Sequence, residues 1–194
     1  MMRVLLLLAL PGMLAGIAGA APLTAKEARD SAAQAVEMIL DINQTIANTY
    51  FHTGEWNKTV AALERVIALN PSDINAYANA AWLLWSSGNT DAAIALYQRM
   101  VEKNPYSSEA YYVYGSYHYF RQQWKEALPL LEQAVKLGVA APKNHLYGHC
   151  LEKLERKPDA LTFWRQLLAA DPKDEVAKKQ IDKLTAPAPD ATTP

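Results

Sequence analysis

The feature that most constrains this chain is a repeat with a period of about 34 residues. Pro71 and Pro105 lie 34 residues apart, and Pro172 follows at close to two further periods. The segment before each proline carries apolar residues at i, i+3, i+4 and i+7, the pattern of an amphipathic helix that ends at a turn. A chain with this period builds a tandem array in which each unit covers the apolar face of the next.

Four segments share this helical pattern. They are GEWNKTVAALERVIALNP (54–71), GNTDAAIALYQRMVEKNP (88–105), QQWKEALPLLEQAVKLGV (122–139) and RKPDALTFWRQLLAADP (156–172). After the turn that ends each of the first three, a further helix is expected, at Ile74–Ser86, Ser108–Arg121 and about Pro142–Leu154. The sequence therefore predicts helical hairpins in tandem.

Four hairpins at this period resemble the tetratricopeptide repeat (TPR) family. With the closing proline numbered as position 32, the repeats span 40–73, 74–107, 108–140 and 141–173. Close helix crossings leave no room for long side chains. The matching small residues are Ala47, Ala81, Gly115 and Gly148 at position 8, and Thr59, Ala93, Ala127 and Ala160 at position 20. Position 24 holds Leu63, Tyr97, Leu131 and Trp164.

This resemblance covers residues 40–172 and implies an all-α fold. The expected architecture is a right-handed α-solenoid of about four TPR-like hairpins with terminal capping helices. The third repeat departs from the pattern, since it has Val139 in place of the closing proline and carries Pro129 early in its second helix. We therefore expect the junction of the third and fourth repeats to be bent or looser than the others.

Both ends of the array also carry helical signals. Residues 21–39 form an alanine-rich pattern that leads into the first repeat, with a capping box at Thr24 and Glu27. Residues 174–185 are amphipathic, as a helix that closes the end of a stack should be. The tail 186–194 is rich in proline, alanine and threonine and is expected to be disordered.

The first twenty residues have the order of a secretory signal peptide. Arg3 precedes an apolar run, and Ala18-Gly19-Ala20 forms a site of the A-x-A type. We expect cleavage after Ala20 and a periplasmic or secreted mature protein. The alternative is an uncleaved membrane anchor, since the apolar segment is nearly long enough to span a bilayer.

Charge and cysteine content narrow the function classes. Loss of residues 1–20 removes one cation, which leaves 18 basic and 20 acidic residues and a net charge of −2. This balance does not favour nucleic acid or an anionic membrane surface as a partner. Cys150 is the only cysteine, so no disulfide can form within the chain.

The chain contains no nucleotide-binding loop, nucleophile elbow or zinc-protease motif, and no catalytic constellation. His145 and His149 share one helix face and offer two possible ligands for zinc or copper, but a third ligand has to come from elsewhere. A metal-linked or enzymatic role at this pair is the alternative to a binding protein. We predict no metal site, no cofactor and no enzymatic activity. His118 and Cys150 are expected to be buried packing residues.

In TPR proteins, positions 2, 5, 9 and 12 of the first helix often face the concave groove and contact a peptide or a partner's helix. By this resemblance, the predicted groove residues are Asn48, Asn79, Trp82, Trp85, Tyr112, Ser116, Tyr119, His145, His149 and Glu152, and the first repeat adds Gln44 and Phe51. The family's carboxylate clamp needs Lys and Arg at several of these positions. Gln44, Glu109 and Val113 stand there instead, so recognition of a terminal carboxylate is disfavoured.

An aromatic and neutral groove suits apolar or proline-containing segments. The sequence therefore predicts a non-enzymatic adaptor or scaffold that is exported and binds a protein or peptide partner. Cell-envelope, secretion or pilus assembly are natural settings for such a protein, by analogy of fold alone.

Overall fold

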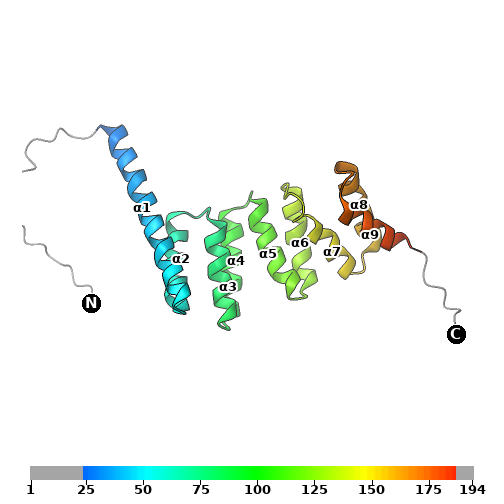
Figure 1. Ribbon diagram of the computed structural model, residues 1–194, viewed down its shortest axis with the longest axis horizontal. Coiled ribbons are helices and arrows are strands. Elements are labelled where there is room, and N and C mark those ends of the chain that lie inside the picture. The colour runs from blue at the N-terminus through cyan, green and yellow to red at the C-terminus, as the bar shows by residue number, and fades with distance from the viewer. Residues whose placement is uncertain (1–23, 187–194) are drawn as a thin grey trace, which may run out of the picture. The chain divides into compact units, whose positions relative to one another are not determined.

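The computed structural model describes residues 24–186, which form nine α-helices and no strand (Figure 1). The predicted signal peptide (1–20) and nearly all of the predicted tail (186–194) lie outside these residues. The helices are α1 (Ala25–His52), α2 (Trp56–Leu69), α3 (Ile74–Ser86), α4 (Thr90–Lys103), α5 (Ser108–Phe120), α6 (Trp124–Lys136), α7 (His145–Lys153), α8 (Lys157–Ala170) and α9 (Glu175–Thr185). The expected all-α fold is confirmed. No helix in this range has the length and hydropathy of a membrane span.

The chain divides after Asp41 into two units. The described part of the first unit, 24–41, is the N-terminal portion of α1, and its start has the predicted capping box. Glu27 N–H donates to Thr24 Oγ1 at 3.2 Å, and the Glu27 carboxylate accepts from the Thr24 N–H at 2.8 Å. These bonds satisfy two helix-terminal donors. The Thr24 N–H and hydroxyl, which both donate to the Glu27 carboxylate, hold the pKa of Glu27 below its usual range.

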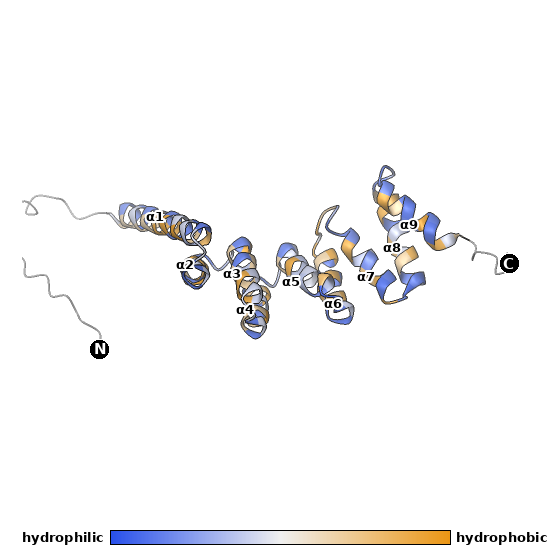
Figure 2. Cartoon of the chain, turned by 60° about the horizontal axis from the view of Figure 1, so that its bottom comes forward, coloured by the Kyte–Doolittle hydropathy of each residue, from blue (hydrophilic) through white to orange (hydrophobic). Residues whose placement is uncertain are grey.

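The second unit begins at Ile42 and contains the rest of α1 and the helices α2 to α9. Successive helices contact one another from α2 through α9, and α3 also contacts α5. Hydrophobic and hydrophilic residues share the surface of each helix (Figure 2), so each helix has an apolar side to bury and a polar side for solvent.

The close crossings predicted at positions 8 and 20 are present, and all eight residues there are buried. A Cβ added to Gly148 would lie 2.4 Å from Trp164 Cζ2, and one added to Gly115 would lie 2.8 Å from Leu131 Cδ2. Glycine therefore lets α7 approach α8, and α5 approach α6, more closely than any other residue would allow.

Three helices start in the same way, two residues after a closing proline. The side chains of Asp73, Ser107 and Asp174 accept hydrogen bonds from the third following backbone N–H, at 3.0, 3.2 and 2.9 Å. The start of α7 has no such side-chain cap, consistent with the missing proline of the third repeat. Lys143 Nζ instead pairs with Glu109 at 2.6 Å across this junction. That the junction is looser than the others stays a prediction.

Candidate functional site

A pocket of about 330 Å³ lies between α1, α2 and α3 in the second unit. Its side chains come from one face of each helix, because they recur at helical spacing. The lining residues are Gln44, Ala47, Asn48 and Phe51 from α1, Thr59 and Leu63 from α2, and Asn79, Trp82 and Leu83 from α3. The volume is at the lower end of the range for ligand pockets.

The pocket combines exposed rings with free carboxamides. Phe51 is 43% exposed and Trp82 is 50% exposed. Asn48 and Asn79 are exposed, and their side chains make no hydrogen bond to any other residue in the range 24–186. Gln44 Nε2 donates to Asp73 Oδ2 at 3.4 Å, which places its amide at the rim. No lining residue is ionisable, so the pocket offers apolar contact and neutral hydrogen bonding.

Three of the ten predicted groove residues, Asn48, Asn79 and Trp82, are thus brought together in one pocket. Trp85 is not part of it, since the Arg121 guanidinium lies 3.9 Å from the centre of its ring. Arg121 also lies 3.7 Å from the Tyr117 ring centre, so it is held between two aromatic residues. Trp85 therefore already has an aromatic-cation contact within the chain.

The predicted groove residues of α5 make contacts within the chain. Tyr112 and Tyr119 are half-buried and pack against the buried cluster of Ala127, Leu131 and Cys150. Burial raises the pKa of Tyr119. Ser116 Oγ donates to the Val113 carbonyl at 2.9 Å, a bond within its own helix.

Comparisons with known proteins agree with this architecture. Residues 50–117 match the family model for the tetratricopeptide repeat, and residues 86–166 match the model for anaphase-promoting complex, cyclosome, subunit 3. The chain therefore carries tetratricopeptide repeats over residues 50–117. No curated protein sequence matches it.

Solved structures share the fold of this TPR protein. The present chain is similar to the MamA protein, with a TM-score of 0.58 and 19% identity over 75% of this chain and 80% of the MamA chain. MamA from Desulfovibrio magneticus RS-1 has a TM-score of 0.56 and 17% identity over 75% and 83% of the two chains. YrrB, described as a TPR protein with an unusual peptide-binding site, has a TM-score of 0.51 and 27% identity over 63% and 64%. The expected TPR-like α-solenoid is therefore confirmed.

In the fourth repeat, the predicted groove residues His145 and Glu152 form hydrogen bonds with other side chains of the same chain. His145 Nε2 lies 2.7 Å from Asp174 Oδ2, the cap of α9. Glu152 accepts from the Trp164 indole N–H at 3.0 Å and from Lys183 at 2.7 Å. The side chains of His145 and Glu152 are only 12% and 11% exposed. The expectation that these two face an open groove is corrected, because α8 and α9 cover them.

His149 lies at the edge of the same group. Its ring is 5.0 Å from the Trp164 ring, and its side chain is one-third exposed. Burial lowers the pKa of His149, and the nearby positive side chains of Lys183 and Lys153 add to the effect, whereas Glu152 opposes it. Contact of His149 with a partner stays a prediction.

Both histidines of the pair contact other side chains of the fourth repeat. His145 and His149 flank the Trp164 ring, and His145 Nε2 is already bonded to Asp174. Between residues 24 and 186, no group of three or more histidine, cysteine or acidic side chains is arranged to hold a metal ion. The neighbouring Cys150 is fully buried, which raises the pKa of its thiol to about 11, and the thiol donates to the Trp124 carbonyl at 3.3 Å.

The predictions for the two packing residues are confirmed. His118 is buried, and its Nδ1 lies 2.8 Å from Gln123 Oε1. Cys150 is buried as described above.

The groove prediction missed Thr59 and Leu63 of α2, which it assigned only to helix packing. A signal for Leu63 was present, because the same position in the second and fourth repeats holds the larger Tyr97 and Trp164.

Proposed function

We propose that this TPR protein is a non-enzymatic adaptor that binds an extended segment of a partner protein in the pocket between α1, α2 and α3. The observation that supports this is the joint presence of two exposed rings, Phe51 and Trp82, and two carboxamides, Asn48 and Asn79, that have no hydrogen-bond partner among residues 24–186. An asparagine side chain both donates and accepts, so it matches the backbone groups of an extended peptide. The likeness to YrrB, itself described as having a peptide-binding site, favours this class of ligand.

We also propose that the protein is exported and that its partner is met outside the cytoplasm. The support is the basic, apolar and A-x-A order of residues 1–20. Sequencing the N-terminus of the protein recovered from its native cell tests this. A mature chain that starts at Ala21 supports export with cleavage, and a retained Met1 or Met2 contradicts the cleaved signal peptide. Any role in assembly of the cell envelope, a secretion system or a pilus rests on this export.

Affinity capture from the extracytoplasmic fraction tests the adaptor function. Wild type should retain a partner that the Asn79→Ala/Trp82→Ala variant loses, while unfolding curves show that the variant is folded. Tyr106→Ala is the matched control, because Tyr106 is an 88% exposed aromatic residue that does not line the pocket. If every captured protein survives the pocket substitutions, the pocket is not the binding site and the proposal is wrong.

A further inference from the structure

The pocket of the first repeat has a counterpart in the fourth repeat, which shows how such a site is filled. Each lining residue has its equivalent 101 residues later in the sequence, and Asp73 at the rim matches Asp174 in the same way. The equivalent pairs on the first helix are Gln44 and His145, Ala47 and Gly148, Asn48 and His149, and Phe51 and Glu152; on the second helix they are Thr59 and Ala160, and Leu63 and Trp164; on the next helix they are Asn79 and Gln180, Trp82 and Lys183, and Leu83 and Leu184. Two sites of one chain therefore share a backbone plan and differ in side chains.

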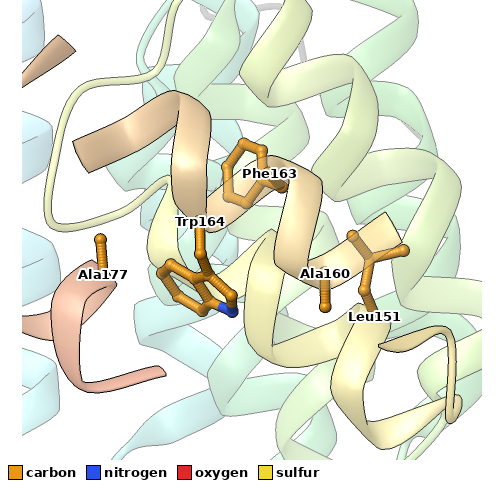
Figure 3. Close-up of a cluster of buried hydrophobic side chains, with 5 residues drawn as sticks. All are labelled: Leu151, Ala160, Phe163, Trp164 and Ala177. Atoms are coloured by element: carbon orange, nitrogen blue, oxygen red, sulfur yellow. The ribbon is translucent and has the colours of Figure 1, made fainter. Parts of the chain in front are cut away.

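In the fourth repeat, an aromatic ring of the chain itself fills this position. Trp164 is fully buried and lies among Leu151, Ala160, Phe163 and Ala177 (Figure 3). Its indole rests so closely on Gly148 that an added Cβ would fall 2.4 Å from the ring.

Polar and aromatic neighbours complete this site around the indole. The Trp164 N–H donates to Glu152, and the rings of His145 and His149 lie 5.7 and 5.0 Å from it. The filled site shows that one large ring, with a polar group at its edge, fits this backbone plan.

The second and third repeats also use their own rings at the equivalent positions. Tyr97, the counterpart of Leu63 in the second repeat, stacks on Tyr114 at 5.5 Å and packs against Tyr117 at 4.7 Å. In the third repeat, Tyr112 and Tyr119 pack over Leu131. The first repeat has Leu63 where the second and fourth have Tyr97 and Trp164, and its Phe51, the equivalent of Tyr119, is 43% exposed, so the pocket opens there.

We propose that this pocket takes an aromatic side chain from an extended segment of the partner protein. This rests on the proposed function and names the chemistry of the ligand. The ring enters between Phe51 and Trp82 and lies over Leu63, as Trp164 lies in the fourth repeat. Asn48 and Asn79 bind the backbone amides on either side of it. Because no lining residue is charged, binding depends little on ionic strength.

Binding of short capped peptides to the isotopically labelled full chain, followed by NMR, tests this. The probes are acetyl-Gly-Ser-X-Ser-Gly-amide with X as Trp, Phe, Tyr, Leu, Pro or Ala. The aromatic peptides should shift the side-chain amide signals of Asn48 and Asn79, with affinity about tenfold or more above that of the alanine peptide, since burial of a large apolar side chain supplies that factor. Equal binding of the leucine or proline peptide overturns the aromatic preference and leaves the adaptor function intact.

A variant that copies the fourth repeat gives a second test. Ala47→Gly/Thr59→Ala/Leu63→Trp should place an indole in the pocket and abolish aromatic peptide binding, with cooperative unfolding retained. Trp82→Ala changes only an exposed side chain, and it should reduce the preference for aromatic peptides even if the triple variant does not fold. Aromatic binding that is unchanged in Trp82→Ala, or in a folded triple variant, overturns the inference.

The remaining outcomes are separable. If no probe peptide binds, the inference is wrong, whereas the adaptor function is decided by whether capture depends on Asn79 and Trp82. If wild type self-associates in sedimentation and Phe120→Ala or the triple variant is monomeric, a second copy of the chain supplies the ring, because Phe120 is a strongly exposed aromatic residue. That result overturns the assignment to a different partner protein.

Discussion

The first and fourth repeats of this protein place different side chains on the same backbone plan, and the difference separates an open pocket from a filled one. In the first repeat, Leu63 leaves a hollow between exposed rings, and Asn48 has no hydrogen-bond partner within residues 24–186. In the fourth repeat, Trp164 fills the equivalent space, and the equivalent of Asn48, His149, packs against it. The first repeat therefore has an open pocket, and the equivalent space in the fourth repeat is filled by the chain itself.

The terminal helix α9 explains why the fourth repeat is closed. It follows α8 with the same turn and aspartate cap that α3 has after α2. Asp174 and Lys183 of α9 bond His145 and Glu152 at the positions where the first repeat has Gln44 and Phe51. We therefore expect substitutions in the fourth repeat to change stability and equivalent substitutions around the pocket to change binding.

The largest expected effect is that of Trp164→Ala. It removes a fully buried ring and leaves Glu152 without its indole donor, which should lower the free energy of unfolding by about 3–5 kcal/mol. Trp82→Ala is the matched control in the open site and should lower this free energy by less, about 1–2 kcal/mol, because half of the Trp82 side chain is already exposed. Urea unfolding followed by circular dichroism measures both. If both variants lose the same free energy of unfolding, the fourth repeat is not more tightly packed than the first, and the comparison is wrong.

Gly148→Ala should follow, with a loss of about 1–3 kcal/mol from overpacking. The added methyl would meet the rigid indole of Trp164 at 2.4 Å, and the ring has no free space to move into. Gly115→Ala is the comparison, since its methyl would meet Leu131 Cδ2 and Cγ at 2.8 Å, a smaller overlap than at Gly148, and it should lose less. A loss at Gly115 as large as that at Gly148 would show that the indole is not the obstacle.

The sequence predicted the helices well because their signals are local. Apolar spacing, closing prolines and caps such as Asp73 and Asp174 act within a few residues of the element that they define. The small residues at positions 8 and 20 also predicted the helix crossings, because the steric limit is the same in every repeat.

The site was harder to predict, since it depends on what lies opposite each groove position. His145 and Glu152 have the register of groove residues, but the bonds that use them come from Asp174 and Lys183. Leu63 has the register of a core residue and is buried, yet it also borders the pocket. The position of a residue in the repeat predicts which face of the helix it occupies. Its exposure to solvent depends on side chains that are far away in the sequence.

A smaller effect should appear with pH at the closed end. Burial lowers the folded-state pKa of His149 below its ordinary value of 6.5, so the unfolded chain binds a proton first as the pH falls. The free energy of unfolding should therefore fall between pH 7.5 and 5, and it should fall less in His149→Gln.

Asp174 reinforces this trend at lower pH. Burial would raise its pKa, but the bonds from Ala177 N–H and His145 hold it below the usual range. The stability that it contributes is lost as the pH falls through its folded pKa. Urea unfolding at each pH, with the exposed His52→Gln as control, measures the effect. An identical pH dependence in wild type and His149→Gln would contradict the assignment.

The smallest expected effect concerns the turns within the hairpins. Position 15 has a positive φ in every repeat: Gly54 and Gly88 occupy it in the first two, and Gln122 (φ 60°) and Glu155 (φ 58°) in the last two. The left-handed region costs a non-glycine residue about 1–2 kcal/mol, and the greater unfolded-state entropy of glycine offsets about 0.5–1 kcal/mol of that. Glu155→Gly should therefore raise the free energy of unfolding by about 0.5 kcal/mol, whereas Gly54→Ala should lower it. If thermal unfolding shows that Glu155→Gly destabilises the protein, then the Glu155 side chain supports the closed repeat in a way that outweighs its backbone strain.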